Sequence, residues 1–205
     1  ASQGKSTLLK DFLEEWPVYS TPDNTYRDLL TDKEHSKTTT EDTQWNILNQ
    51  MVDVLQDSGK LSSDNIIYDR CPLDNIVYSL WAHEKGHVSK EFIDKCIPIV
   101  KESLRALDII FFIPLTKAHT VPIVDDGTRE TDSEYIKEID NIFKAMAAYY
   151  YQDTGPFFVH DDKPAIIEVF GDPLARLEII KLYIDADGDS IGEQGILDPS
   201  EISLL

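Results

Sequence analysis

The sequence predicts one α/β domain over residues 1–183, with a central, mostly parallel sheet flanked by helices, followed by an acidic tail over 184–205. Short apolar segments of strand type alternate with longer segments whose apolar residues recur at helical spacing, as is typical of βαβ units. The strongest strand signal is Asp-Ile-Ile-Phe-Phe-Ile at residues 108–113, which ends at Pro114. A length of 205 residues is sufficient for one well-buried core, whereas two domains would each be small.

The other elements follow from apolar periodicity and turn residues. Thr43 is placed to cap a helix that carries Trp45 and Leu48 and stops at Ser58 and Gly59. Further strands are predicted at residues 18–20, 66–68, 157–160 and 166–170. Further helices are predicted at residues 8–13, 73–83, 90–104, 135–146 and 173–183, and polar loops at 31–41 and 116–129.

Composition and charge restrict the classes of function that the protein can have. The chain is 41% hydrophobic but has no apolar run near the roughly 18 residues of a membrane span, so we expect a soluble protein without a membrane partner. Cys71 and Cys96 lack metal-ligand spacing and fit a reducing compartment, for which the cytoplasm is the default. A formal net charge of −19 repels nucleic acid at long range, so the expected substrate is a metabolite rather than a polymer.

The acidic tail contains no Lys or Arg from Asp185 onward. Asp185, Asp187 and Asp189 resemble the start of a calcium loop, but Ser190 stands where that loop has Gly and Ile196 where it has Glu. We therefore interpret this segment as a solvated tail rather than a calcium site.

Gly4-Lys5-Ser6-Thr7, at the head of an amphipathic helix, is the second half of a phosphate loop. The complete pattern places another Gly and a strand before this tetrapeptide, so we expect both upstream of Ala1. The N–H groups and partial positive charge of a helix N-terminus attract phosphate. Lys5 is expected to neutralise β- and γ-phosphate charge, and the Ser6 hydroxyl to ligate Mg²⁺. The alternative is an ordinary N-terminal helix.

Two further polar clusters carry candidate chemistry. Asp69-Arg70 directly follows the strand at 66–68, at the edge where parallel sheets place their ligands. An acid there can hold the Mg²⁺ shell or the acceptor hydroxyl, and Arg70 offers a planar fork for phosphate, with a structural ion pair as the alternative. Asp-Asp-Gly-Thr-Arg at 125–129 is a polar loop whose Arg129 can close over the γ-phosphate and exclude water, with a solvated turn as the alternative.

In order and spacing, these motifs resemble the P-loop nucleoside and nucleotide kinases, a group with thymidylate kinases, deoxynucleoside kinases, nicotinamide riboside kinase domains and viral relatives. The resemblance rests on Gly-Lys-Ser-Thr, on Ile-Ile-Tyr-Asp-Arg-Cys-Pro-Leu-Asp-Asn-Ile-Val-Tyr at 66–78, and on the 125–129 loop, and it covers nearly all of residues 1–183. It implies a P-loop NTPase-type three-layer sandwich with a central, mostly parallel sheet and a small lid. It also implies ATP and Mg²⁺ as cofactors.

The resemblance further implies a role for each matching residue. On the ATP side it assigns the phosphates to Gln3, Gly4, Lys5, Ser6 and Thr7, Mg²⁺ to Ser6 and Asp69, and the border of adenine to Gly171, Asp172 and Pro173. On the acceptor side it assigns Asp23, Arg27, Gln44, Trp45, Asp69, Arg70 and Asp74, with core packing as the alternative for Trp45. The implied catalytic residues are Lys5, Asp23, Asp69, Arg70 and Arg129. Asp23 best matches the acid that activates the acceptor hydroxyl, although Asp28 competes and the usual Glu-containing pattern is missing around it.

The sequence thus predicts transfer of the γ-phosphoryl group of ATP to a small nucleoside or nucleoside monophosphate. One alternative is a kinase acting on modified bases in DNA, against which the acidic charge counts. A second is a non-catalytic regulatory module that binds ATP or GTP. Nucleic acid is not an expected partner, and a homodimer is left open.

Overall fold

The computed structural model describes residues 4–22, 39–57, 65–116, 132–150 and 164–191. In chain order its elements are α1 (Lys5–Glu15), α2 (Glu41–Asp57), α3 (Pro72–Glu84), α4 (Lys90–Leu104), β1 (Ile109–Phe112), α5 (Ser133–Tyr150), β2 (Ala165–Glu168) and α6 (Pro173–Ile180).

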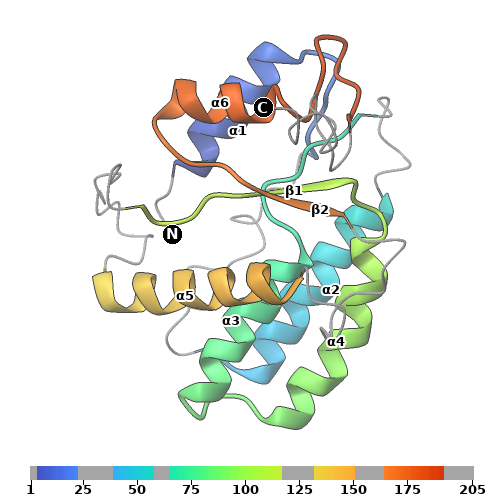
Figure 1. The fold of residues 1–205 in the computed structure, drawn as a ribbon. Coiled ribbons are helices and arrows are strands. Elements are labelled where there is room, and N and C mark those ends of the chain that lie inside the picture. Colours follow the sequence, from blue (N-terminus) through green and yellow to red (C-terminus); the bar gives the residue numbers. More distant parts are fainter. Residues whose placement is uncertain (1–3, 23–38, 58–64, 117–131, 151–163, 192–205) are drawn as a thin grey trace, which may run out of the picture.

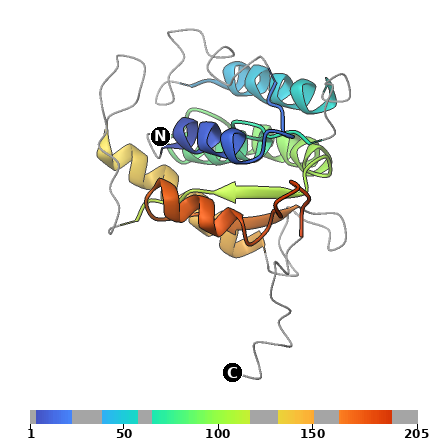
Figure 2. The same cartoon turned by 90° about the horizontal axis from the view of Figure 1, so that it is seen from above.

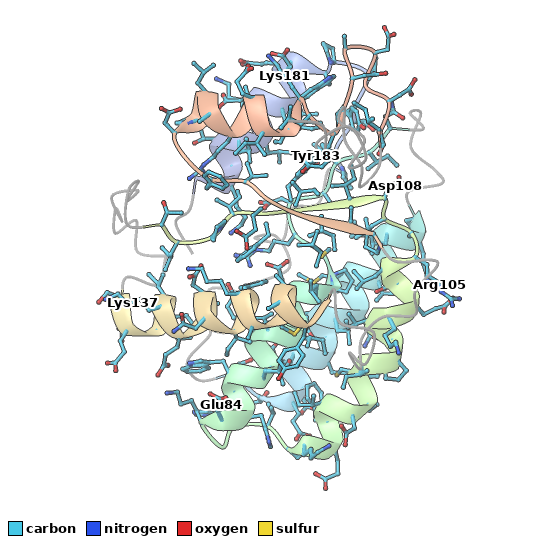
Figure 3. The ribbon with its side chains drawn as sticks, viewed as in Figure 1. Glu84, Arg105, Asp108, Lys137, Lys181 and Tyr183 are labelled. Carbon is cyan, nitrogen blue, oxygen red and sulfur yellow. The ribbon has the colours of Figure 1, made fainter. Side chains whose placement is uncertain are left out.

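These elements form three layers (Figure 1). The sheet of β1 and β2 lies between the helix pair α1 and α6 on one side and the helices α2 to α5 on the other. Seen from above, α1 and α6 run side by side (Figure 2). Arg105, which follows α4, is exposed and points away from the layers (Figure 3). None of the described helices is long and apolar enough to cross a membrane.

Strands β1 and β2 pair in parallel, with Ile109 opposite Ala165. Because successive side chains of a strand point to opposite faces, β1 contributes to two apolar cores. Ile110 and Phe112 pack against the core formed with α2 to α5, whereas Ile109 and Phe111 pack against the core formed with α1 and α6. The continuous apolar run of β1 therefore reflects a strand that is covered by helices on both faces.

The predicted α/β fold with a parallel sheet is confirmed, with differences at element ends. The prediction that Thr43 caps α2 is wrong, because the helix begins at Glu41 and the Thr40 hydroxyl accepts the Thr43 N–H at 3.2 Å. The last predicted helix ends at Ile180, and turns follow it. The strands predicted at 18–20 and 66–68 form a single parallel bridge, between Ser20 and Ile66. The strand predicted at 157–160 lies outside the described residues.

Residues 184–191, which the sequence assigns to the acidic tail, fold back onto the end of α1. The Trp16 indole N–H donates to the Asp185 carbonyl at 2.7 Å, and the Tyr19 hydroxyl donates to the Gly188 carbonyl at 2.9 Å. The Asp185 carboxylate accepts two backbone N–H groups of its own turn. These hydrogen bonds attach the first part of the predicted solvated tail to the domain, and the rest of the tail lies outside the described residues.

Candidate active site

The start of α1 has the geometry of an anion-binding helix end. Gly4 caps the helix with φ 72° and ψ 24°, a left-handed conformation that glycine adopts without a Cβ penalty. Its carbonyl accepts the Leu8 N–H at 2.9 Å, so helical bonding begins at this residue. The first turn contains no acidic side chain; it carries Lys5 and the exposed residues Ser6 and Thr7. An amide-rich, positively charged helix end of this kind favours phosphate.

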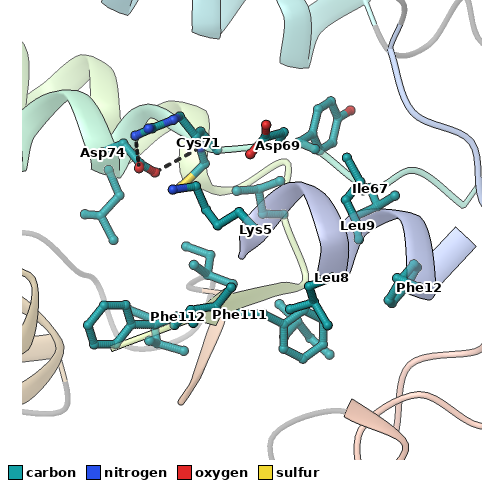
Figure 4. Close-up of a pocket in the computed structure, with 18 of the residues that line it drawn as sticks. Lys5, Leu8, Leu9, Phe12, Ile67, Asp69, Cys71, Asp74, Phe111 and Phe112 are labelled. Atoms are coloured by element: carbon teal, nitrogen blue, oxygen red, sulfur yellow. Dashed lines mark hydrogen bonds and ion pairs between the residues drawn. The ribbon is translucent and has the colours of Figure 1, made fainter. Parts of the chain in front are cut away.

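A cavity of about 400 Å³ lies between α1, the segment 65–71, β1 and α5 (Figure 4). Lys5 extends from the start of α1 toward the segment that carries Asp69 and Cys71 (Figure 4). Lys5, Asp69 and Arg70 all line the cavity. The structure therefore brings together the phosphate-loop lysine and the acid and arginine that follow the 66–68 strand.

Arg70 is held in one orientation by its neighbours on α3. Its backbone φ is 88°, a value that is costly for a residue with a Cβ, and no other non-glycine residue in the described part of the chain has a positive φ. Arg70 Nη1 donates to Asp74 Oδ1 at 3.0 Å and to the Tyr78 hydroxyl at 3.3 Å. The Tyr78 ring centroid lies 5.7 Å from the guanidinium carbon. All three side chains line the cavity, so its polar wall is fixed before any ligand binds.

Cys71 lines the same cavity but is not suited to act as a nucleophile. Burial, reinforced by the nearby Asp74 charge, raises the pKa of its thiol to about 12. Its backbone N–H donates to Asp74 Oδ2 at 3.3 Å, which closes a capping box at the start of α3. Because the thiolate is the reactive form, a thiol with this pKa is inert near neutral pH.

Gln44 and Trp45, assigned by resemblance to the acceptor base, do not line this cavity. Gln44 is buried, and its amide donates to Thr39 Oγ1 at 2.8 Å and accepts from Asn75 Nδ2 at 2.8 Å. These bonds engage the amide in joining α2 to α3. Trp45 packs against the helical core, and Lys95 Nζ lies 3.4 Å from its ring centroid. Trp45 therefore packs in the core, which is the alternative interpretation given for it in the sequence analysis.

The predicted adenine border, Gly171 to Pro173, forms a tight turn from β2 into α6. Gly171 has φ 96°, and a Cβ on it would lie 2.8 Å from the Ala175 Cβ, so the turn requires glycine. The Asp172 side chain caps α6 by accepting the Ala175 N–H at 2.9 Å, and Pro173 occupies the first helical turn. The Asp172 carboxylate is therefore engaged with the helix itself.

Arg176 is a buried arginine beside the phosphate loop whose position was not predicted from the sequence. Arg176 is only 5% exposed, although other residues of the same helix, such as Leu174, are exposed. Its Nε donates to the Gly171 carbonyl at 2.9 Å, and its Nη1 lies 3.1 Å from where a Cβ on Gly4 would be. The signal in the sequence is an arginine one turn before Ile180, on the face of α6 that packs inward.

Several predicted site residues lie outside the described residues: Gln3, Asp23, Arg27, Asp28 and Arg129. The same holds for the loop 125–129. In the described part of the chain, no group of three or more His, Cys, Asp or Glu side chains is arranged to hold a metal ion. This includes the described part of the acidic turn that begins at Asp185.

The layered fold and the phosphate-loop residues at the start of α1 are matched by known proteins. A family model described as an AAA domain matches residues 1–152, and the chain belongs to this family. Deoxyadenosine kinase from M. mycoides, solved with the products dCMP and a flexible dCDP bound, has a similar fold at a TM-score of 0.61. The two chains are 14% identical, and the match covers 88% of this chain and 92% of that one. Comparison with curated proteins gave no match.

Proposed function

We propose that the protein transfers the γ-phosphoryl group of ATP to a small nucleoside or nucleoside monophosphate. The observation that carries this proposal is the single cavity lined by Lys5, Asp69 and Arg70. The family and the fold support phosphoryl transfer on a nucleoside as the reaction class. The likeness to a deoxyadenosine kinase solved with dCMP and dCDP bound supports nucleosides and nucleotides as the acceptor class.

The ATP side of the proposal joins the start of α1 to the turn before α6. The amides of Gly4 to Thr7 hold the phosphates, and Lys5 neutralises their charge. The Gly171–Pro173 turn borders the adenine, since it is linked to Gly4 through a buried arginine and is flanked by exposed apolar surface. Phe170 is 52% exposed and Leu174 is 70% exposed, and side chains of this kind provide an apolar contact for a base.

The residues present fit a magnesium ion bound together with ATP. The Ser6 hydroxyl and the Asp69 carboxylate are the oxygen donors that this cation prefers. Mg²⁺ usually keeps several waters and phosphate oxygens as ligands, so it needs no dedicated protein cage. When bound, the ion neutralises charge on the β- and γ-phosphates.

On the acceptor side, the chain's own residues act mainly by positioning. Asp69 accepts a hydrogen bond from the acceptor hydroxyl, and the Arg70 fork, already oriented by Asp74, binds a phosphate oxygen. Phosphoryl transfer has a loose transition state, so a fixed and water-poor arrangement of charges accounts for most of the catalysis. Asp23 and Arg129 remain the predicted general base and lid arginine.

The direct test is ADP formation from ATP with a panel of nucleosides, their monophosphates and nicotinamide riboside. Formation of ADP that depends on one acceptor, with a matching phosphorylated product, supports the proposal. Binding of ATP without turnover against the whole panel contradicts it and favours the regulatory module. A gel-shift series with duplex DNA at increasing salt tests the DNA-base alternative, for which we expect no specific complex.

A further inference from the structure

We propose that Arg176 is a positioning residue that couples the phosphate loop to the turn before α6 and thereby sets the affinity for ATP. The inference rests on the proposed function, because it concerns the same nucleotide site. Arg176 belongs neither to the phosphate-loop motif nor to the Asp69-Arg70 cluster, so neither motif predicts a role for it.

The coupling is visible in the contacts of one guanidinium. Arg176 Nε donates to the Gly171 carbonyl at 2.9 Å, which fixes the turn proposed to border adenine. At its other end, Nη1 lies 3.1 Å from the position that a Cβ on Gly4 would take, a tight contact. A planar group of fixed shape therefore spans the backbone of the phosphate loop and that of the adenine turn, and sets the distance between them.

The positive charges around Arg176 also favour an anionic ligand. Arg176 lies beside the N-terminal end of α1, where the helix dipole is positive and Lys5 adds a second cation. The first turn of α1 has no acidic residue. Burial lowers the pKa of Arg176, and the charge of Asp172 opposes this only in part. A triphosphate bound at this helix end would bring negative charge close to both cations.

The test compares Arg176→Met and Arg176→Lys with the control Arg105→Met, using the wild-type protein as reference. Arg105 follows α4, is exposed (Figure 3) and forms a surface ion pair with Glu102 at 3.1 Å. The measurements are the equilibrium Kd for ATP, the KM for ATP and for the acceptor, kcat, and the melting temperature without nucleotide.

For Arg176→Met we expect the Kd and KM for ATP to rise at least about tenfold, with the acceptor KM unchanged. Arg176→Lys keeps the charge but not the fork, so it should show a smaller rise, and Arg105→Met none. A side chain with a merely structural role would lower the melting temperature and the active fraction, and so kcat, without changing the KM for ATP.

An ATP affinity within about twofold of wild type in both Arg176 variants overturns the inference, whatever their melting temperatures. If Arg176→Met does not fold, Arg176→Lys alone decides: a raised Kd supports the inference and an unchanged Kd overturns it. If the wild-type protein itself does not bind ATP, the proposed function fails and this inference fails with it. The two failures are therefore distinguished by the wild-type measurement.

Discussion

Arg70 and Asp74 form a closed pair on the wall of the candidate site, with Nη1 and Oδ1 3.0 Å apart and side chains only 14% and 16% exposed. The pair is one helical turn apart in sequence, but Arg70 precedes α3 and reaches it from a left-handed backbone position. Because water screens this pair weakly, the carboxylate determines where the arginine fork points. Asp74 is thus expected to act on the acceptor through Arg70.

The first prediction concerns this pair. Asp74→Asn should lower kcat/KM for the acceptor about tenfold, because Arg70 loses the charge that orients it. The matched control is Asp94→Asn, which breaks the ion pair of Lys90 and Asp94 with the same sequence spacing but with side chains 70% and 55% exposed. Steady-state kinetics give kcat/KM for the acceptor in both variants. A kcat/KM for Asp74→Asn equal to that of Asp94→Asn would show that the pair has no role in acceptor binding.

The phosphate-loop lysine gives the second prediction. Lys5→Ala should lower kcat by about 10²–10³, the usual effect of removing one group that stabilises transition-state charge. Lys10→Ala on the same helix is the control, since Lys10 is 74% exposed and pairs with Glu14 at the surface. Circular dichroism melting curves should be alike for both variants. Retained turnover in Lys5→Ala would refute the assignment of α1 as the phosphate-binding helix.

Local patterns predicted much of this fold, and long-range contacts explain what they did not predict. Residues 90–104 were predicted as a helix and form α4, because its apolar spacing and the Ser89 cap are properties of one segment. The proximity of Lys5 to Asp69 was predicted from the rule that parallel strands end at one edge. The burial of Gln44 was not predicted, since it depends on Asn75 on another helix. The burial of Arg176 was not predicted for the same reason. Gly4 lies far from it in the sequence, and Gly171 lies outside the helix that carries it.

The turn before α6 gives a stability prediction with a close control. Gly171→Ala should destabilise the fold by more than Gly86→Ala, although both residues have positive φ, at 96° and 80°. Each alanine adds the left-handed penalty of about 1–2 kcal/mol. Only at Gly171 does the new Cβ also meet another atom, the Ala175 Cβ at 2.8 Å, whereas nothing lies within 4 Å at Gly86. Urea unfolding of the two variants measures the difference, and equal midpoints would mean that the turn relaxes freely.

The two buried thiols predict a loss of stability in alkali. Burial raises the pKa of Cys71 to about 12 and that of Cys96 to about 11, from an ordinary value of 9.0. The fold therefore favours the protonated thiols. Their contribution is complete below the unfolded-state pKa and is lost as the pH rises toward the folded-state values.

The matching experiment is urea unfolding under reducing conditions from about pH 8 to about pH 11. The free energy of unfolding should fall across this range, and it should fall less steeply in the double variant Cys71→Ala/Cys96→Ala. Tyr19, Lys85 and Lys181 also have raised pKa values but are present in both proteins, so the difference reports the thiols. Parallel curves would contradict the prediction.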